Sequence, residues 1–147
     1  RVPTRNLRVC NIHVPRTGLE AKFSLRLVSA MALAGRSTSD IAAYDDRLCT
    51  DRELGRLRDS IRVVGDDELA RGTSEVIVSM DDGVVYREFD NVSVPSRDLD
   101  DQGRRLEDKF VTLASPVIGE GKSRELVELV GKLEQLESMD ALLQRCQ

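Results

Sequence analysis

Aromatic residues are scarce in this chain of 147 residues, which contains no tryptophan, two tyrosines and three phenylalanines. An excess of positive charge is also absent, because 22 lysines and arginines are interleaved with 26 aspartates and glutamates. Proteins that bind nucleic acids present a basic surface to the phosphates, and those that bind single strands stack the bases on aromatic rings. The composition therefore argues against a nucleic-acid partner.

Long hydrophobic runs are missing as well. No segment approaches the roughly 20 consecutive apolar residues that a membrane-spanning helix needs, and residues 1–9 lack the apolar core of a secretory signal. Hydrophobic residues nevertheless make up 40% of the chain, which is enough to form a folded core. We expect a cytoplasmic protein with no membrane partner, folded as one α+β domain over residues 1–147.

Residues that bind metals or carry acid–base chemistry are few and scattered. Cys10, Cys49 and Cys146 lie far apart without a C-x-x-C pair, and His13 is the only histidine. A structural zinc site needs more ligands at closer spacing, and the paired aspartates of the chain lack the alternating spacing of a calcium loop. We therefore expect no metal and no cofactor, and a structural role for His13.

The first half of the chain is predicted to form one strand and several helices. Residues 7–14 alternate imperfectly between the two faces of an extended chain, which favours a strand. Apolar residues then recur at helical spacing from Phe23 to Ala34, and Gly35 ends this helix. Shorter helices are expected after Ser37 and after Thr50.

The second half begins with a change of period. Residues 76–80 alternate, Asp81-Asp82-Gly83 supplies a tight turn, and residues 84–89 return as a second strand, which predicts a β-hairpin. Leucine-rich helices follow, one of them from about Ser123. These patterns indicate an α+β fold. We expect a two-layer sandwich whose mixed or antiparallel sheet of about four strands, including His13 and the hairpin, is covered by helices.

Two charged residues stand at the opening of the predicted long helix, namely Glu20 and Lys22. A lysine beside the amide donors of a helix N-terminus can bind a carboxylate. A surface lysine next to a helix start explains the same residues equally well. Both interpretations stay open on physical grounds alone.

Residues 15–25 read PRTGLEAKFSL, and this string resembles the segment P-x-T-G-L-E-A-K-F-S-L of the MmgE/PrpD family. The order of the later predicted elements is similar too, so that the resemblance extends over about residues 7–145. It implies the C-terminal α+β domain of a two-domain protein, with the family's N-terminal helical domain absent from this chain. Leu27 stands where many members carry a tyrosine.

Family members include 2-methylcitrate dehydratase, cis-aconitate decarboxylase and iminodisuccinate epimerase, which act on small polycarboxylates without an organic cofactor. Such chemistry removes a proton next to a carboxylate and needs cationic groups that hold the other carboxylates. The resemblance implies that Lys22 binds substrate, with Glu20 and Ser24 as its matched neighbours, in a site completed by the helical domain. It also implies a homodimer. The alternative is a non-catalytic module for dimerisation or partner binding.

Overall fold

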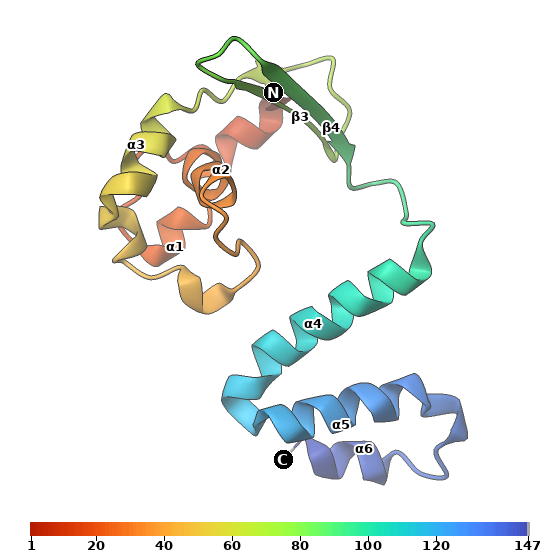
Figure 1. Cartoon of the computed structure of the whole chain (residues 1–147). Coiled ribbons are helices and arrows are strands. Elements are labelled where there is room, and N and C mark those ends of the chain that lie inside the picture. Colours follow the sequence, from red (N-terminus) through yellow and green to blue (C-terminus); the bar gives the residue numbers. More distant parts are fainter. Residues whose placement is uncertain (147) are drawn as a thin grey trace. The chain divides into compact units, whose positions relative to one another are not determined.

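The computed structural model describes residues 1–146. They fall into two compact units whose boundary lies between Pro95 and Ser96 (Figure 1). The first unit holds helices and all four strands, whereas the elements of the second unit are all helical. Within the residues described, no helix is both long enough and apolar enough to cross a membrane.

Three α-helices of the first unit begin at side-chain caps. They are α1 (Gly18–Ala21), α2 (Leu25–Leu33) and α3 (Arg52–Ser60). Thr17, Ser24 and Asp51 precede these helices, and each side chain accepts hydrogen bonds from backbone amides of the first turn. Three short 3₁₀ helices complete the set: η1 (Thr4–Arg8), η2 (Ile41–Ala43) and η3 (Leu48–Thr50).

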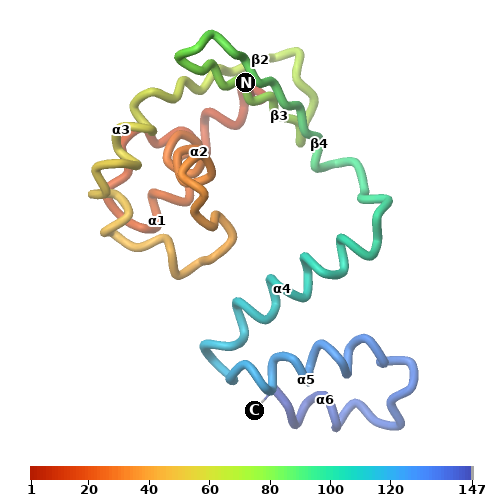
Figure 2. The backbone as a smooth tube through the Cα atoms, in the orientation of Figure 1, coloured from red at the N-terminus to blue at the C-terminus, as the bar shows by residue number. Residues whose placement is uncertain are grey.

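The core of the first unit lies among these helices, and α2 packs against α3 (Figure 2). Leu27 and Leu54 are almost completely buried at this contact, with partly buried Tyr44 and Cys49 against them. The predicted long helix is confirmed as α2, and Gly35 follows it with φ 68°, a conformation that favours glycine. The complete cluster of buried residues is Ala21, Leu27, Ala30, Met31, Leu48 and Leu54.

The strands form two separate pairs. β1 (Val2–Pro3) runs parallel to β2 (Gly65–Asp66), and β3 (Thr73–Ser79) runs antiparallel to β4 (Val85–Asn91). The second pair is the predicted hairpin, in register from Thr73 opposite Asn91 to Ser79 opposite Val85. The α+β class and the expected four strands are thus confirmed, with one parallel pair and one antiparallel pair.

The strand predicted over residues 7–14 is wrong. Its beginning belongs to η1, and His13 lies exposed in a bend, so His13 shares no sheet with the hairpin. The segment is held instead beside the start of α2, where Ile12 N donates to Phe23 O at 3.1 Å and Leu25 N donates to Cys10 O at 3.0 Å. The imperfect alternation reflects this irregular path, because an isolated bridge does not require a continuous buried face.

The second unit is built on two helices, α4 (Leu99–Ile118) and α5 (Glu120–Gly131), which contact each other. Gly119 separates them with φ 87°. Asp98 caps α4 by accepting a hydrogen bond from Asp101 N. A 3₁₀ turn, η4 (Leu133–Gln135), and a last helix, α6 (Asp140–Arg145), follow.

Candidate functional site

The segment Pro15–Ser24, which carries the family-like string, folds as a tight loop around α1. Gly18 N donates to Asp46 Oδ1 at 2.8 Å, and a Cβ at Gly18 would overlap the carbonyl oxygen of Tyr44. Thr17 Oγ1 caps the turn by accepting from Glu20 N at 3.2 Å. Threonine and glycine at these two positions therefore seat α1 against the loop that contains Tyr44.

Glu20 closes the same loop. Its Oε2 accepts a hydrogen bond from Arg16 N at 2.7 Å, and the residue is half-buried. A carboxylate bound to a backbone amide stabilises the turn. The structure thus places Glu20 where it supports the loop beneath Lys22.

Ser24 is fully buried, and its Oγ accepts a hydrogen bond from Leu27 N at 3.3 Å. This is the N-cap of α2, the helix that supplies much of the core. Leu27, at the position where many family members have tyrosine, lies in that core as well. The side chains of Ser24 and Leu27 therefore serve the packing of α2.

Lys22 is exposed and stands between α1 and α2, as the C-cap residue of α1. It precedes Ser24, the N-cap of α2, by two residues. The amides of Leu25 and Leu27 at the start of α2 already bond to Cys10 O and to Ser24 Oγ. The ammonium group of Lys22 itself offers a positive charge to a carboxylate.

The ammonium of Lys22 lies over the ring of Tyr44, with Nζ 5.7 Å from the ring centroid. This distance is within the range of a cation–π interaction. Within residues 1–146, no carboxylate oxygen comes within the 4.0 Å of an ion pair with Lys22. The positive charge is therefore not neutralised by an ion pair in the part of the chain described.

Sequence reasoning missed Tyr44 and Cys49, which flank the same loop. Burial raises the pKa of the Tyr44 hydroxyl above its usual 10.0. Burial also raises the pKa of the Cys49 thiol above 9.0, and the negative charges of Asp46 and Glu20 add to this effect. A thiol held protonated near neutral pH is a poor nucleophile, and the Cys49 thiol instead donates to Thr17 O at 3.3 Å.

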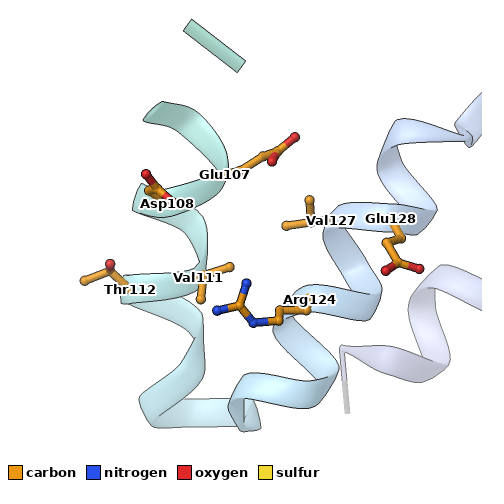
Figure 3. Close-up of a pocket in the computed structure, with 7 residues that line it drawn as sticks. All are labelled: Glu107, Asp108, Val111, Thr112, Arg124, Val127 and Glu128. Atoms are coloured by element: carbon orange, nitrogen blue, oxygen red, sulfur yellow. The ribbon is translucent and has the colours of Figure 1, made fainter. Parts of the chain in front are cut away.

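A concave region lies between α4 and α5 and has a volume of about 500 Å³. Arg124 extends from α5 toward α4 within it (Figure 3), while forming an ion pair with Glu120 at 2.8 Å. Three of its lining residues are acidic and one is basic, so this groove offers little attraction to a substrate with several carboxylates. Its lining residues are Glu107, Asp108, Val111, Thr112, Arg124, Val127 and Glu128.

Metal ligands are not grouped in the described part of the chain. Among residues 1–146, no three histidine, cysteine, aspartate or glutamate side chains are placed together to hold a metal ion.

Comparison with known proteins gives one clear result. The family model described as the MmgE/PrpD C-terminal domain matches residues 1–135, which include all of the first unit and both long helices of the second. No curated protein matches the chain. Because the family model covers nearly the whole sequence, the chain belongs to the MmgE/PrpD family, whose C-terminal domain it carries.

Proposed function

We propose that this chain is the C-terminal domain of a lyase or isomerase that acts on small polycarboxylates, and that Lys22 binds one of the substrate's carboxylates. The observation that carries the proposal is the exposed ammonium of Lys22, which is free of ion pairs within residues 1–146 and lies in the loop that resembles the family segment. Dehydration of 2-methylcitrate is the reaction that we favour for this family member.

The physical support comes from the charges that such a reaction requires. Removing a proton next to a carboxylate builds negative charge on the substrate, and a nearby cation lowers the energy of that state. An exposed lysine retains its charge at neutral pH and can pair with a carboxylate. Glu20 and Ser24 contribute by holding the loop that presents Lys22.

The remaining catalytic groups come, in this proposal, from a helical domain of the same family. His13 is exposed in a bend, and Cys49 has a raised pKa, so neither forms an acid–base pair on this chain. Catalysis by proton transfer needs several groups in a fixed geometry. We therefore expect the chain by itself to bind polycarboxylates weakly and to show no turnover of 2-methylcitrate.

The proposal is tested by measuring which of the four lysines of the chain responds to citrate. Reductive dimethylation with ¹³C keeps each ammonium charged and gives every lysine its own NMR signal. We expect millimolar citrate to shift the Lys22 signal and to leave that of Lys109 on α4 unchanged. Lys22→Met should abolish the saturable binding, whereas Lys109→Met, the matched control, should not.

The same substitution has a consequence for catalysis. When the chain acts with a helical domain of the family, Lys22→Met should lower kcat/KM for 2-methylcitrate by about 5- to 150-fold, which corresponds to about 1–3 kcal/mol. Thermal unfolding should change little because Lys22 is exposed. Equal citrate shifts at all four lysines, or an unchanged kcat/KM, would contradict the role of Lys22.

A second candidate function is dimerisation or the binding of a protein partner. The observation that favours it is apolar exposure in both units, on the hairpin and along α4, where one stripe of side chains recurs at helical spacings of seven, four and three residues. Contiguous apolar surface of this kind commonly marks an interface. The stripe on α4 consists of Leu99, Leu106, Phe110, Leu113 and Val117.

Sedimentation distinguishes this second candidate from the first. The interaction module would be favoured if the chain self-associates and does not bind citrate. In that case Tyr86→Lys on the hairpin or Phe110→Lys on α4 should abolish the self-association. Citrate binding through Lys22, in a monomer or in a dimer, would favour the enzyme domain.

A further inference from the structure

We infer that Tyr44 is a positioning residue that holds the Lys22 ammonium in place for an incoming carboxylate. The inference rests on the proposed function of Lys22 and adds the group that determines where its charge lies. The face of the Tyr44 ring is 5.7 Å from Nζ, measured to the ring centroid. An aromatic face attracts a cation through its quadrupole, without neutralising the positive charge.

Tyr44 is itself fixed from several sides. Its hydroxyl donates to Thr38 O at 2.7 Å, and its ring packs against the buried cluster of the first unit. Its carbonyl oxygen lies so close to Gly18 that no side chain fits between them. The ring is therefore held by a hydrogen bond, by packing and by its own backbone.

The loop leading to Tyr44 is ordered by further hydrogen bonds. Asp40 N donates to Ser37 Oγ at 3.2 Å, and Ala42 N donates to Asp40 Oδ1 at 2.9 Å. These bonds form the short helix η2 directly before Tyr44. The ring thus belongs to a structured element and is suited to restrain a flexible neighbour.

A lysine side chain has four rotatable bonds and loses much conformational freedom when it binds a ligand. A ring that already restricts Lys22 in the free protein reduces the loss that accompanies carboxylate binding. The hydroxyl is directed to Thr38 and does not contribute to the attraction of the ring face. Removing the ring should weaken citrate binding about two- to fivefold, and removing the hydroxyl alone should have little effect.

The position of Lys22 can be tested in the unmodified chain. Protons above an aromatic face are shifted upfield, so the ε-methylene signals of Lys22 should lie upfield of those of Lys109 in a ¹H–¹³C spectrum. Tyr44→Phe should keep this shift, and Tyr44→Leu should remove it. Tyr86→Leu, which alters the other tyrosine of the chain, serves as the matched control and should leave Lys22 unchanged.

Citrate titration of the same proteins tests the consequence for binding. We expect the dissociation constant to rise two- to fivefold in Tyr44→Leu, and to stay within the error of the wild type in Tyr44→Phe and Tyr86→Leu. If Tyr44→Leu fails to fold, the wild-type shift and Tyr44→Phe still decide whether the ring holds Lys22.

Two different failures can be told apart. An unshifted Lys22 signal in the wild type, or undiminished citrate binding in folded Tyr44→Leu, would overturn the positioning role while leaving the proposed function intact. Citrate binding that survives Lys22→Met would overturn the proposed function. In that case the upfield shift would show only that ring and ammonium are in contact, and the inference of a positioning role for binding would fail with it.

Discussion

The helical cluster around α2 and α3 and the β3–β4 hairpin belong to the same unit but bury their apolar residues very differently. Leu54 on α3 is 0% exposed, whereas Val85 and Tyr86 on β4 are 57% and 61% exposed. The helices are therefore stabilised by packing, and the hairpin mainly by its backbone ladder. Similar hydrophobic content thus leads to a core in one region and to an open surface in the other.

The register of the hairpin shows that both of its faces carry apolar residues. Val76, Val78 and Tyr86 share one face, and Ile77, Val85 and Phe89 share the other. An isolated pair of strands is marginally stable in water, and a solvent-facing side normally carries polar residues. The hairpin sequence is typical of a strand pair that is covered on both sides.

The largest expected difference between the regions concerns truncation of a side chain. Leu54→Ala should lower the free energy of unfolding by about 2–5 kcal/mol, because it leaves a cavity in the buried cluster. Val85→Ala should change it by no more than about 0.5 kcal/mol, because that side chain is already in water. Urea denaturation of both variants measures the contrast. Equal losses would show that the hairpin is as closely packed as the helices.

A smaller effect is expected where backbone segments touch. Gly18→Ala should destabilise the cluster by about 1–3 kcal/mol, since its Cβ would overlap the carbonyl of Tyr44 and force the loop to move. Gly55→Ala, inside α3 with nothing within 4 Å of the added atom, should stabilise the protein by about 0.5–1 kcal/mol. Thermal melts of both variants provide the measurement. A stabilising Gly18→Ala would mean that the contact between α1 and Tyr44 is loose.

The smallest expected effect is that of pH: acid should affect both regions, and alkali should distinguish them. A hydrogen bond from Leu54 N and the nearby Arg36 lower the pKa of Asp51 in the cluster below 3.8. Beside the hairpin, Arg1 lowers the pKa of Glu75 below 4.5, and a backbone bond from Glu68 together with Arg1 lowers that of Asp66 below 3.8. Because folding lowers these pKa values, their stabilisation is complete above the ordinary values and is lost on acidification.

Alkali should act on the cluster alone. Folding raises the pKa values of Cys49 and Tyr44 above their ordinary values of 9.0 and 10.0. The contribution of these two groups to the free energy of unfolding is therefore complete below the ordinary values and is lost as pH rises through the pKa values of the folded state. We therefore expect NMR signals of α2 and α3 to broaden first above pH 9.0, while acid below pH 4.5 perturbs both regions. Loss of the hairpin signals first in alkali would contradict this assignment.

Local sequence patterns predicted the elements that are stabilised by interactions between residues close together in the chain. The spacing from Phe23 to Ala34 predicted α2, and Asp81-Asp82-Gly83 predicted the hairpin turn, in which Gly83 N donates to Met80 O at 3.0 Å. The prediction of a strand over residues 7–14 was wrong because the partner of this segment, residues 23–25, is determined by packing around α2. Alternation alone cannot identify such a partner.

The features of the candidate site likewise fall into two groups, those that local sequence predicts and those that depend on tertiary packing. By itself, the sequence determined α2, the hairpin turn and the family-like string that contains Lys22. Only the tertiary structure decided that Ser24 is buried, that Glu20 bonds to Arg16 N, and that Tyr44 lies under Lys22. Caps and turns depend on hydrogen bonds between near neighbours, which a short string of residues specifies. The meeting of Lys22 with Tyr44 instead depends on how α1 and the loop after α2 pack against one core, and no local spacing encodes that arrangement.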